Sequence, residues 1–280
     1  MHGKLKTLVD VLLSFFTALS LFASAVCFLL CSTVCSDSFL LSRMERSGFY
    51  ESNFNEFRTE LTYLAEPIGI DPARLEEVLL QNHLRQDVDE SIRYSFREIA
   101  FTPDSTSFET GIHDALAAYA KEKDAAINEE NLQNISQLCG ELYREHATLS
   151  YVGSLGHYAN LFRTPLLVAA LVCAAMGIIL ICIQFSIHHY KHRALRYVIC
   201  GLSGAGLSLS VFPAIVLLSG KIRHLSITDE SLYRLVVTYL NTLLNYLVIT
   251  GAACLCVSLL LGLVYRRIHP ARRHARRHGR

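Results

Sequence analysis

Long uncharged apolar runs are the feature that most constrains how this chain folds. Each run reaches the roughly 20 residues that a helix needs to cross about 30 Å of hydrocarbon. A hydrophobic content of 51% is also higher than that of an ordinary soluble domain. The sequence therefore predicts an all-α integral membrane protein with four transmembrane helices. The four runs cover residues 11–34, 166–187, 198–218 and 235–264.

The acidic residues are concentrated between the first two runs. Of 25 acids, 22 lie between Asp37 and Glu145, and only Asp10, Asp229 and Glu230 lie elsewhere. Soluble domains normally intersperse both signs over their surface, so this segregation is typical of a membrane protein. Residues 37–163 carry a net charge of −11, which the overall charge of +1 conceals. We expect a solvated acidic domain here, with no specific binding of nucleic acid.

Basic residues predict the side of the membrane on which each segment lies, because cytoplasmic loops carry an excess of Lys and Arg. The amino terminus, the link at residues 188–196 and the carboxyl-terminal tail are all basic. An even number of crossings also returns the chain to its starting side. The predicted domains are a cytoplasmic N-terminus with the first helix (1–36), an extracytoplasmic helical domain (37–163), three transmembrane helices (164–265) and a cytoplasmic Arg/His-rich tail (266–280).

The cysteines form no disulfide framework. Seven of the nine lie within the apolar runs, and Cys35 lies at the rim of the first run. A bridge from Cys35 to Cys139 stays open, because sequence does not test its geometry. Together with the compact size, this usage favours a bacterial plasma membrane. The first run is interpreted as a retained anchor, since it is longer than the core of a typical cleavable signal peptide.

Helical spacing recurs through the acidic domain. Tyr50, Phe54, Phe57, Leu61 and Leu64 step by four and three residues, and this helix is expected to end before Pro67. About five helices with apolar stripes predict an antiparallel bundle. Further helices are expected over residues 71–79, 86–99 and 112–125, and one more should start at a cap at Asn128. The residues expected to face inward are Val88, Ile92, Phe96 and Ile99 in the helix at 86–99, and Leu132, Ile135, Leu138 and Leu142 in the last one. Residues 153–162 should lead helically into the second run.

One short segment carries candidate catalytic residues. Ser154 and His157 lie three residues apart at the predicted outer edge of the membrane, where a reactive serine would suit acyl chemistry on lipid or lipoprotein. The sequence lacks the G-x-S-x-G signature, and we favour a glycine-containing joint as the explanation of this segment. The histidines of the acidic domain are scattered, so we expect no metal site. No cofactor is expected either.

The fourth run carries a polar stripe in its outer half, at positions i, i+3, i+4 and i+7. Amide side chains are costly in hydrocarbon, so the stripe should face another helix or a cavity. The third run offers small residues at four-residue steps, which favours close packing of runs three and four over a substrate pathway. No titratable residue lies deep in runs two to four, which disfavours a proton-coupled transporter. The candidate ligand-binding residues are Thr238, Asn241, Thr242 and Asn245.

The order of one span, an outer domain and three further spans resembles the arrangement of FtsX- and MacB-type permease subunits. The resemblance is one of topology and involves no sequence motif. It implies a separate ATPase that contacts residues 188–196, since this chain has no phosphate-binding loop of its own. The basic tail suits attachment to anionic lipid of the inner leaflet.

These patterns favour a non-enzymatic, permease-like or sensor protein. Its extracytoplasmic domain would bind a protein, peptide or envelope ligand and couple it to the transmembrane bundle. One alternative is an enzyme that acts on lipid or lipoprotein at the outer membrane face through Ser154 and His157. A third hypothesis is a small-solute transporter lined by Asn241 and Asn245.

Overall fold

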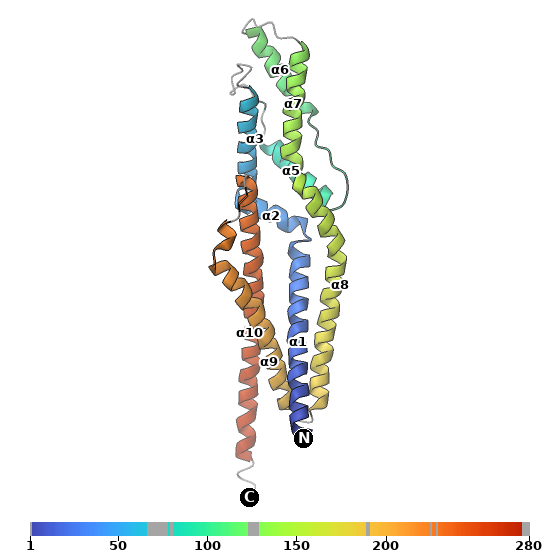
Figure 1. The fold of residues 1–280 in the computed structure, drawn as a ribbon, viewed down its shortest axis with the longest axis vertical. Coiled ribbons are helices and arrows are strands. Elements are labelled where there is room, and N and C mark those ends of the chain that lie inside the picture. Colours follow the sequence, from blue (N-terminus) through green and yellow to red (C-terminus); the bar gives the residue numbers. More distant parts are fainter. Residues whose placement is uncertain are drawn as a thin grey trace. The chain divides into compact units, whose positions relative to one another are not determined.

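The chain folds into helices that form two compact units. The computed structural model describes residues 2–65, 78, 81–122, 129–188, 191–224, 226–227 and 229–275, and no strand occurs among them. One unit, here called the apolar unit, comprises residues 1–33, 163–225 and 239–280. The other, called the acidic unit, comprises residues 34–162 and 226–238. Two long helices, α8 and α10, contribute residues to both units (Figure 1).

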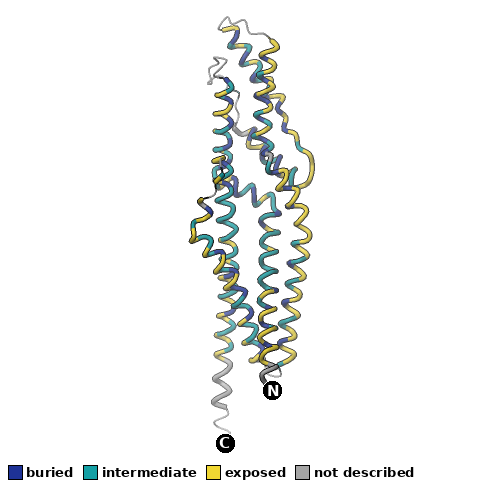
Figure 2. Tube along the Cα trace, viewed as in Figure 1, coloured by how far each residue is buried: buried dark blue, intermediate teal, exposed yellow. Residues whose placement is uncertain are grey.

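Four helices of the described chain are long and apolar enough to cross a membrane, as the sequence predicts. Figure 2 shows exposed residues along each of them, and many of these are large apolar side chains, as expected for surfaces that face lipid. Residues 153–162 are helical and continue into the second span without a break, as predicted. The four helices are α1 (His2–Thr33), α8 (Ser150–Ile187), α9 (Lys191–Leu218) and α10 (Glu230–Ala275).

Hydroxyl groups on one face of α1 hold the apolar unit together. Ser20 Oγ donates to the backbone carbonyl of Cys173 on α8 at 2.5 Å, and Ser24 Oγ donates to that of Ala170 at 3.0 Å. On α9, the carbonyl of Tyr197 accepts a hydrogen bond of 2.9 Å from Ser14 Oγ. In hydrocarbon an unsatisfied polar group costs several kcal/mol, so bonds of this kind fix which faces of the three helices meet.

The same face of α1 carries a buried carboxylate. Asp10 is 5% exposed, and its Oδ1 lies 3.1 Å from Nε2 of His188, whose ring stacks on Tyr197 with centroids 5.7 Å apart. These two atoms are close, but their geometry is not that of a hydrogen bond. One turn earlier on α8, the buried Gln184 donates from Nε2 to Thr17 Oγ1 at 3.0 Å, while its Oε1 has no partner. A polar seam therefore joins α1 to α8.

The small residues of α9 serve two neighbours. A Cβ added at Gly206 would lie 3.0 Å from the carbonyl oxygen of Gly251 on α10, which confirms the predicted close packing of these helices. Gly201 and Gly204 face α1 instead: a Cβ added at Gly204 would lie 3.4 Å from Cβ of Ala18. The sequence predicted only the first of these two contacts.

Replacing Gly251 by alanine should destabilise the apolar unit. The new Cβ would overlap Ser210 Oγ and lie 2.7 Å from the backbone oxygen of Gly206, so the helices must separate. Overpacking of this kind costs about 1–3 kcal/mol. Gly262→Ala is the matched control, because nothing lies within 4 Å of a Cβ at Gly262. Thermal unfolding of the full chain in a mild detergent measures both variants, and equal transitions would contradict the close contact.

The acidic unit is a helical bundle with a single apolar core. Phe57 and Leu61 of α3 pack with Phe108 and Ile112 of α6 and with Tyr143 of α7. The complete helices of this unit are α2 (Asp37–Ser47), α3 (Phe49–Ala65), α5 (Gln81–Ser95), α6 (Thr106–Glu122) and α7 (Glu129–Thr148).

Several expectations for the acidic unit are corrected. Helix α2 was not predicted, although Ser36 caps its start and Gly48, with φ of +71°, ends it. Ile99 is 50% exposed because α5 ends at Ser95 and the chain turns at Glu98, where φ is +56°. The predicted helix at residues 71–79 and the cap at Asn128 lie outside the described residues, apart from Val78.

The face that α7 buries is predicted in part. Leu132 is buried and Ile135 and Leu142 pack against the core as expected, but Leu138 is 48% exposed. The predicted stripe of large apolar residues misses Ser136 and Cys139, which are small and are also buried. Cys35 and Cys139 are both buried free thiols. Burial raises the pKa of Cys139 to about 11, so this thiol stays protonated and unreactive near neutral pH.

Truncating Phe57 should unfold the acidic unit more easily. Its ring is fully buried and lies against Phe108, Tyr143 and His146, with centroids 5.4 to 5.9 Å away. Phe57→Ala should cost about 3–5 kcal/mol. Tyr63→Ala, on the same helix but 66% exposed, should change stability by less than about 0.5 kcal/mol. Chemical denaturation of the full chain compares them, and similar midpoints would show that α3 does not pack as described.

Candidate functional site

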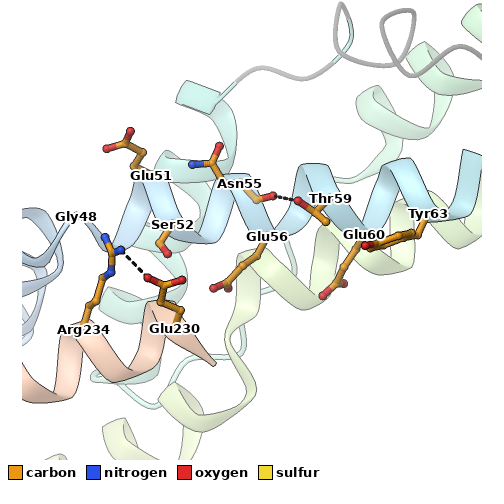
Figure 3. A pocket seen from close by; sticks show the side chains of 10 residues that line it. All are labelled: Gly48, Glu51, Ser52, Asn55, Glu56, Thr59, Glu60, Tyr63, Glu230 and Arg234. Atoms are coloured by element: carbon orange, nitrogen blue, oxygen red, sulfur yellow. Dashed lines mark hydrogen bonds and ion pairs between the residues drawn. The ribbon is translucent and has the colours of Figure 1, made fainter. Parts of the chain in front are cut away.

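A pocket of about 540 Å³ lies in the acidic unit between α3 and the first turn of α10 (Figure 3). The spacing of the α3 residues by three and four puts them on the face opposite the buried Phe57 and Leu61. Glu230 and Arg234 close the pocket from α10 and form an i,i+4 ion pair at 2.5 Å. The α3 residues that line it are Glu51, Ser52, Asn55, Glu56, Thr59, Glu60 and Tyr63, together with Gly48 before the helix.

Two carboxylates cap the start of α10 inside this site. Asp229 Oδ1 accepts from the backbone N–H of Leu232 at 3.0 Å and from Ser231 Oγ at 2.7 Å. Glu56 Oε1 accepts from the backbone N–H of Ser231 at 3.2 Å. The first N–H groups of a helix have no partner within the helix, so the oxygens of these two side chains supply acceptors at this helix start. Glu56 thereby ties α10 to α3.

The electrostatics of the site favour a proton or another cation near Glu56. Burial and then the neighbouring Asp229 raise the pKa of Glu56, and the hydrogen bonds from Ser231 only partly offset this. Burial, then Asp229 and Glu56, also raises the pKa of Tyr151, whose hydroxyl is buried without a hydrogen-bond partner. Burial disfavours the charged forms of both groups, and the neighbouring carboxylates add to that effect, so a nearby cation would stabilise an ionised Glu56.

His146 of α7 supports the pocket from beneath α3. Its Nδ1 lies 3.0 Å from Asn53 Oδ1, and Asn53 Nδ2 in turn donates to the backbone carbonyl of His146 at 3.3 Å. Its Nε2 lies 3.3 Å from Glu60 Oε2. Both ring nitrogens thus face oxygen acceptors, and His146 fixes Glu60 at the pocket wall.

The charged and aromatic side chains that line the pocket favour a cationic ligand. The pocket contains four glutamates against one arginine, and that arginine is already paired with Glu230. Glu51 is exposed and pairs with no described residue. Tyr63 presents a ring that is 66% exposed beside Glu60, and an aromatic face attracts ammonium and guanidinium groups. This arrangement suits a Lys or Arg side chain.

The structure does not bring Ser154 and His157 together as a catalytic pair. Both are exposed on α8, no hydrogen bond joins them, and His157 Nδ1 lies 3.1 Å from Glu98 Oε1. Gly156 is buried because α8 passes close to the end of α5: an added Cβ would lie 2.6 Å from the carbonyl oxygen of Ser95. The glycine in this segment is explained by packing, and the enzymatic role stays a hypothesis.

The polar stripe of the fourth span lies on one continuous helix, α10, and its role in ligand binding stays a hypothesis. Thr238 belongs to the acidic unit, whereas Asn241, Thr242 and Asn245 belong to the apolar unit. Asn245 is exposed and Asn241 is half-buried, and neither amide bonds to another part of the described chain. Across the residues that the structure covers, no cluster of His, Cys, Asp and Glu could hold a metal ion.

Sequence reasoning missed both the pocket and the polar seam of the apolar unit. The sequence does contain a pattern that indicates the seam, because polar residues recur at helical spacing within the first apolar run. These residues are Asp10, Ser14, Thr17 and Ser24. The pocket had none, since the bond from Ser231 to Glu56 joins residues 175 positions apart.

Comparison of the chain with protein-family models, with curated proteins and with solved structures found no match. The site therefore has to be interpreted from its own geometry.

Replacing Glu56 by glutamine should change how stability depends on pH. Because the folded-state pKa is raised, ionised Glu56 weakens the folded state above that pKa. Stability therefore rises as the pH falls through the raised pKa towards 4.5, the ordinary value of a glutamate. Glu56→Gln removes this dependence yet keeps an oxygen acceptor for Ser231, so it should be more stable than the parent near neutral pH.

Thermal unfolding of the full chain in detergent between pH 4 and 8 tests this. The difference between the parent and Glu56→Gln should shrink as the pH falls, whereas Glu51→Gln should follow the parent throughout. A constant difference across the range, or a less stable variant at neutral pH, would show that the charge on Glu56 does not oppose folding.

Proposed function

We propose that this protein is a membrane-anchored receptor whose acidic unit binds a basic peptide segment and passes the binding event to the membrane helices. The ligand's Lys or Arg side chains would enter the pocket between α3 and the start of α10. This makes the protein a non-enzymatic binding or sensor component rather than a lipid-modifying enzyme.

The observation that carries the proposal is that one helix both lines the pocket and contains a segment long and apolar enough to cross a membrane. Glu230 and Arg234 line the pocket from the first turn of α10, and the same helix continues to Ala275 through a segment long and apolar enough to cross a membrane. A ligand that competes for Glu230 or Glu56 acts directly on the ion pair and cap that begin this helix. Ligand binding could therefore act on the membrane-spanning segment of α10 directly, without a further structural element between them.

The charge distribution supports an extracytoplasmic position for the acidic unit. Residues 37–163 carry a net charge of −11, whereas the amino terminus, residues 188–196 and the tail are basic. Basic segments stay on the cytoplasmic side. In this orientation the pocket meets ligands outside the cell, and long-range attraction draws cationic ones to it.

A single tryptophan can report on the pocket, because the chain contains none. In Tyr63→Trp the indole lies at the pocket wall, and titration with a short oligoarginine peptide in an uncharged detergent should change its fluorescence saturably. Adding Glu51→Gln or Glu60→Gln should weaken binding by about two- to fivefold each, since exposed ion pairs contribute roughly 0.2–1 kcal/mol. Raising the salt concentration should weaken it further.

Two controls make the titration specific. Tyr158→Trp places the indole on an exposed part of α8 outside the pocket lining and should not respond. Glu141→Gln removes one negative charge elsewhere in the acidic unit and should leave the affinity unchanged. Equal responses at both reporters, or equal losses from Glu141→Gln and Glu51→Gln, would mean that the peptide binds the general negative charge, and the proposal would fail.

A further inference from the structure

The apolar unit has a groove of about 700 Å³ on the surface of the segments that are long and apolar enough to cross a membrane. Phe22 and Val26 of α1 form one wall, and Leu247 of α10 forms part of another. The floor is the carboxyl-terminal half of α9, from Leu207 to Ile215. Apart from the hydroxyl of Ser208, every side chain that lines it is apolar.

The groove arises because α9 passes from one neighbour to the other. Its first half lies against α1, where Gly201 faces Ser14 and Thr17, and its middle lies against α10 at Gly251. Beyond these contacts none of the described helices covers its large side chains: Phe212 is 70% exposed and Ile215 is 60% exposed. Figure 1 shows α9 starting beside α1 and continuing past α10.

A positive charge lies beyond one end of the groove. Helix α9 ends at Leu218, three positions after Ile215, which corresponds to about 4.5 Å along the helix axis. Gly220, with φ of +65°, ends that helix, and the short helix η2 (Lys221–His224) follows. Lys221 is exposed, forms no ion pair with any described residue, and has no acid beside it in η2.

We propose that this groove is a binding site for one anionic phospholipid, with an acyl chain against α9 and the headgroup phosphate at Lys221. Apart from the hydroxyl of Ser208, the groove's side chains offer no hydrogen-bonding group to water or to a polar ligand. A cation at the end of an apolar groove matches a molecule that has a hydrocarbon chain and a negative headgroup. The lipid comes from the leaflet on the η2 side of α9, where a lysine stem can reach the headgroup level.

The test uses Phe212→Trp as a single indole in the groove, with the protein in nanodiscs that contain brominated-chain lipids. Bromine quenches an indole on contact. Brominated phosphatidylglycerol should quench it at a several times lower mole fraction than brominated phosphatidylcholine. Adding Lys221→Gln should reduce that preference by about fivefold, since a basic residue near an anionic surface contributes roughly that factor. Leu171→Trp, on an exposed apolar position of α8 outside the groove, should show no headgroup preference.

A filled groove should lose the lipid. Val26→Trp places bulk in the wall, so native mass spectrometry should detect one retained phosphatidylglycerol on the parent chain and none on this variant. Equal preference at Phe212→Trp and Leu171→Trp would reduce the site to ordinary boundary lipid and overturn the proposal. Protection of Phe212→Trp from both lipids, together with a dimer mass, would show that a second copy of the chain fills the groove instead.

Discussion

The apolar unit depends on one constraint, which is that hydroxyls and amides within long apolar helices need partners. Helix α1 meets it by donating from its serines to backbone carbonyls of α8 and α9, bonds that exist only when those faces meet. Apolar side chains alone would not specify this arrangement, because lipid is as apolar as leucine. The close approach of Asp10 to His188 adds a further polar contact between α1 and the end of α8. Packing of glycine against glycine then adds α10 to α9.

In the acidic unit the groups that would bind the proposed ligand also take part in folding. Glu56 caps α10, and Glu60 is held by His146, yet both also line the pocket. These carboxylates are therefore positioned by the bundle before any ligand arrives, which lowers the conformational cost of binding. The proposed ligand would therefore compete with a helix cap and one surface ion pair, and would leave the buried core intact.

The sequence predicted whatever depends on residue type along a single helix. Four spans, the helix through Phe57 and Leu61, and the small residues at Gly206 all follow from local patterns. It failed where the partner decides the outcome. Leu138 is exposed and Ser136 buried because α7 turns its small residues towards its neighbours. No local pattern places Ser231 beside Glu56, so the pocket could not have been found without the fold.

The glycine contact between α9 and α10 also limits how α10 can move. One helical turn on either side of Gly251 stands a leucine, Leu247 or Leu255, and the second already lies 2.9 Å from the point where a Cβ at Gly206 would be. Sliding α10 by a turn, about 5.4 Å, would bring such a side chain against the backbone of α9. A slide of α10 by a whole turn is therefore opposed by this contact. Under the proposed function, tilt or rotation about a pivot at Gly251 is the motion of α10 that the glycine contact allows most readily.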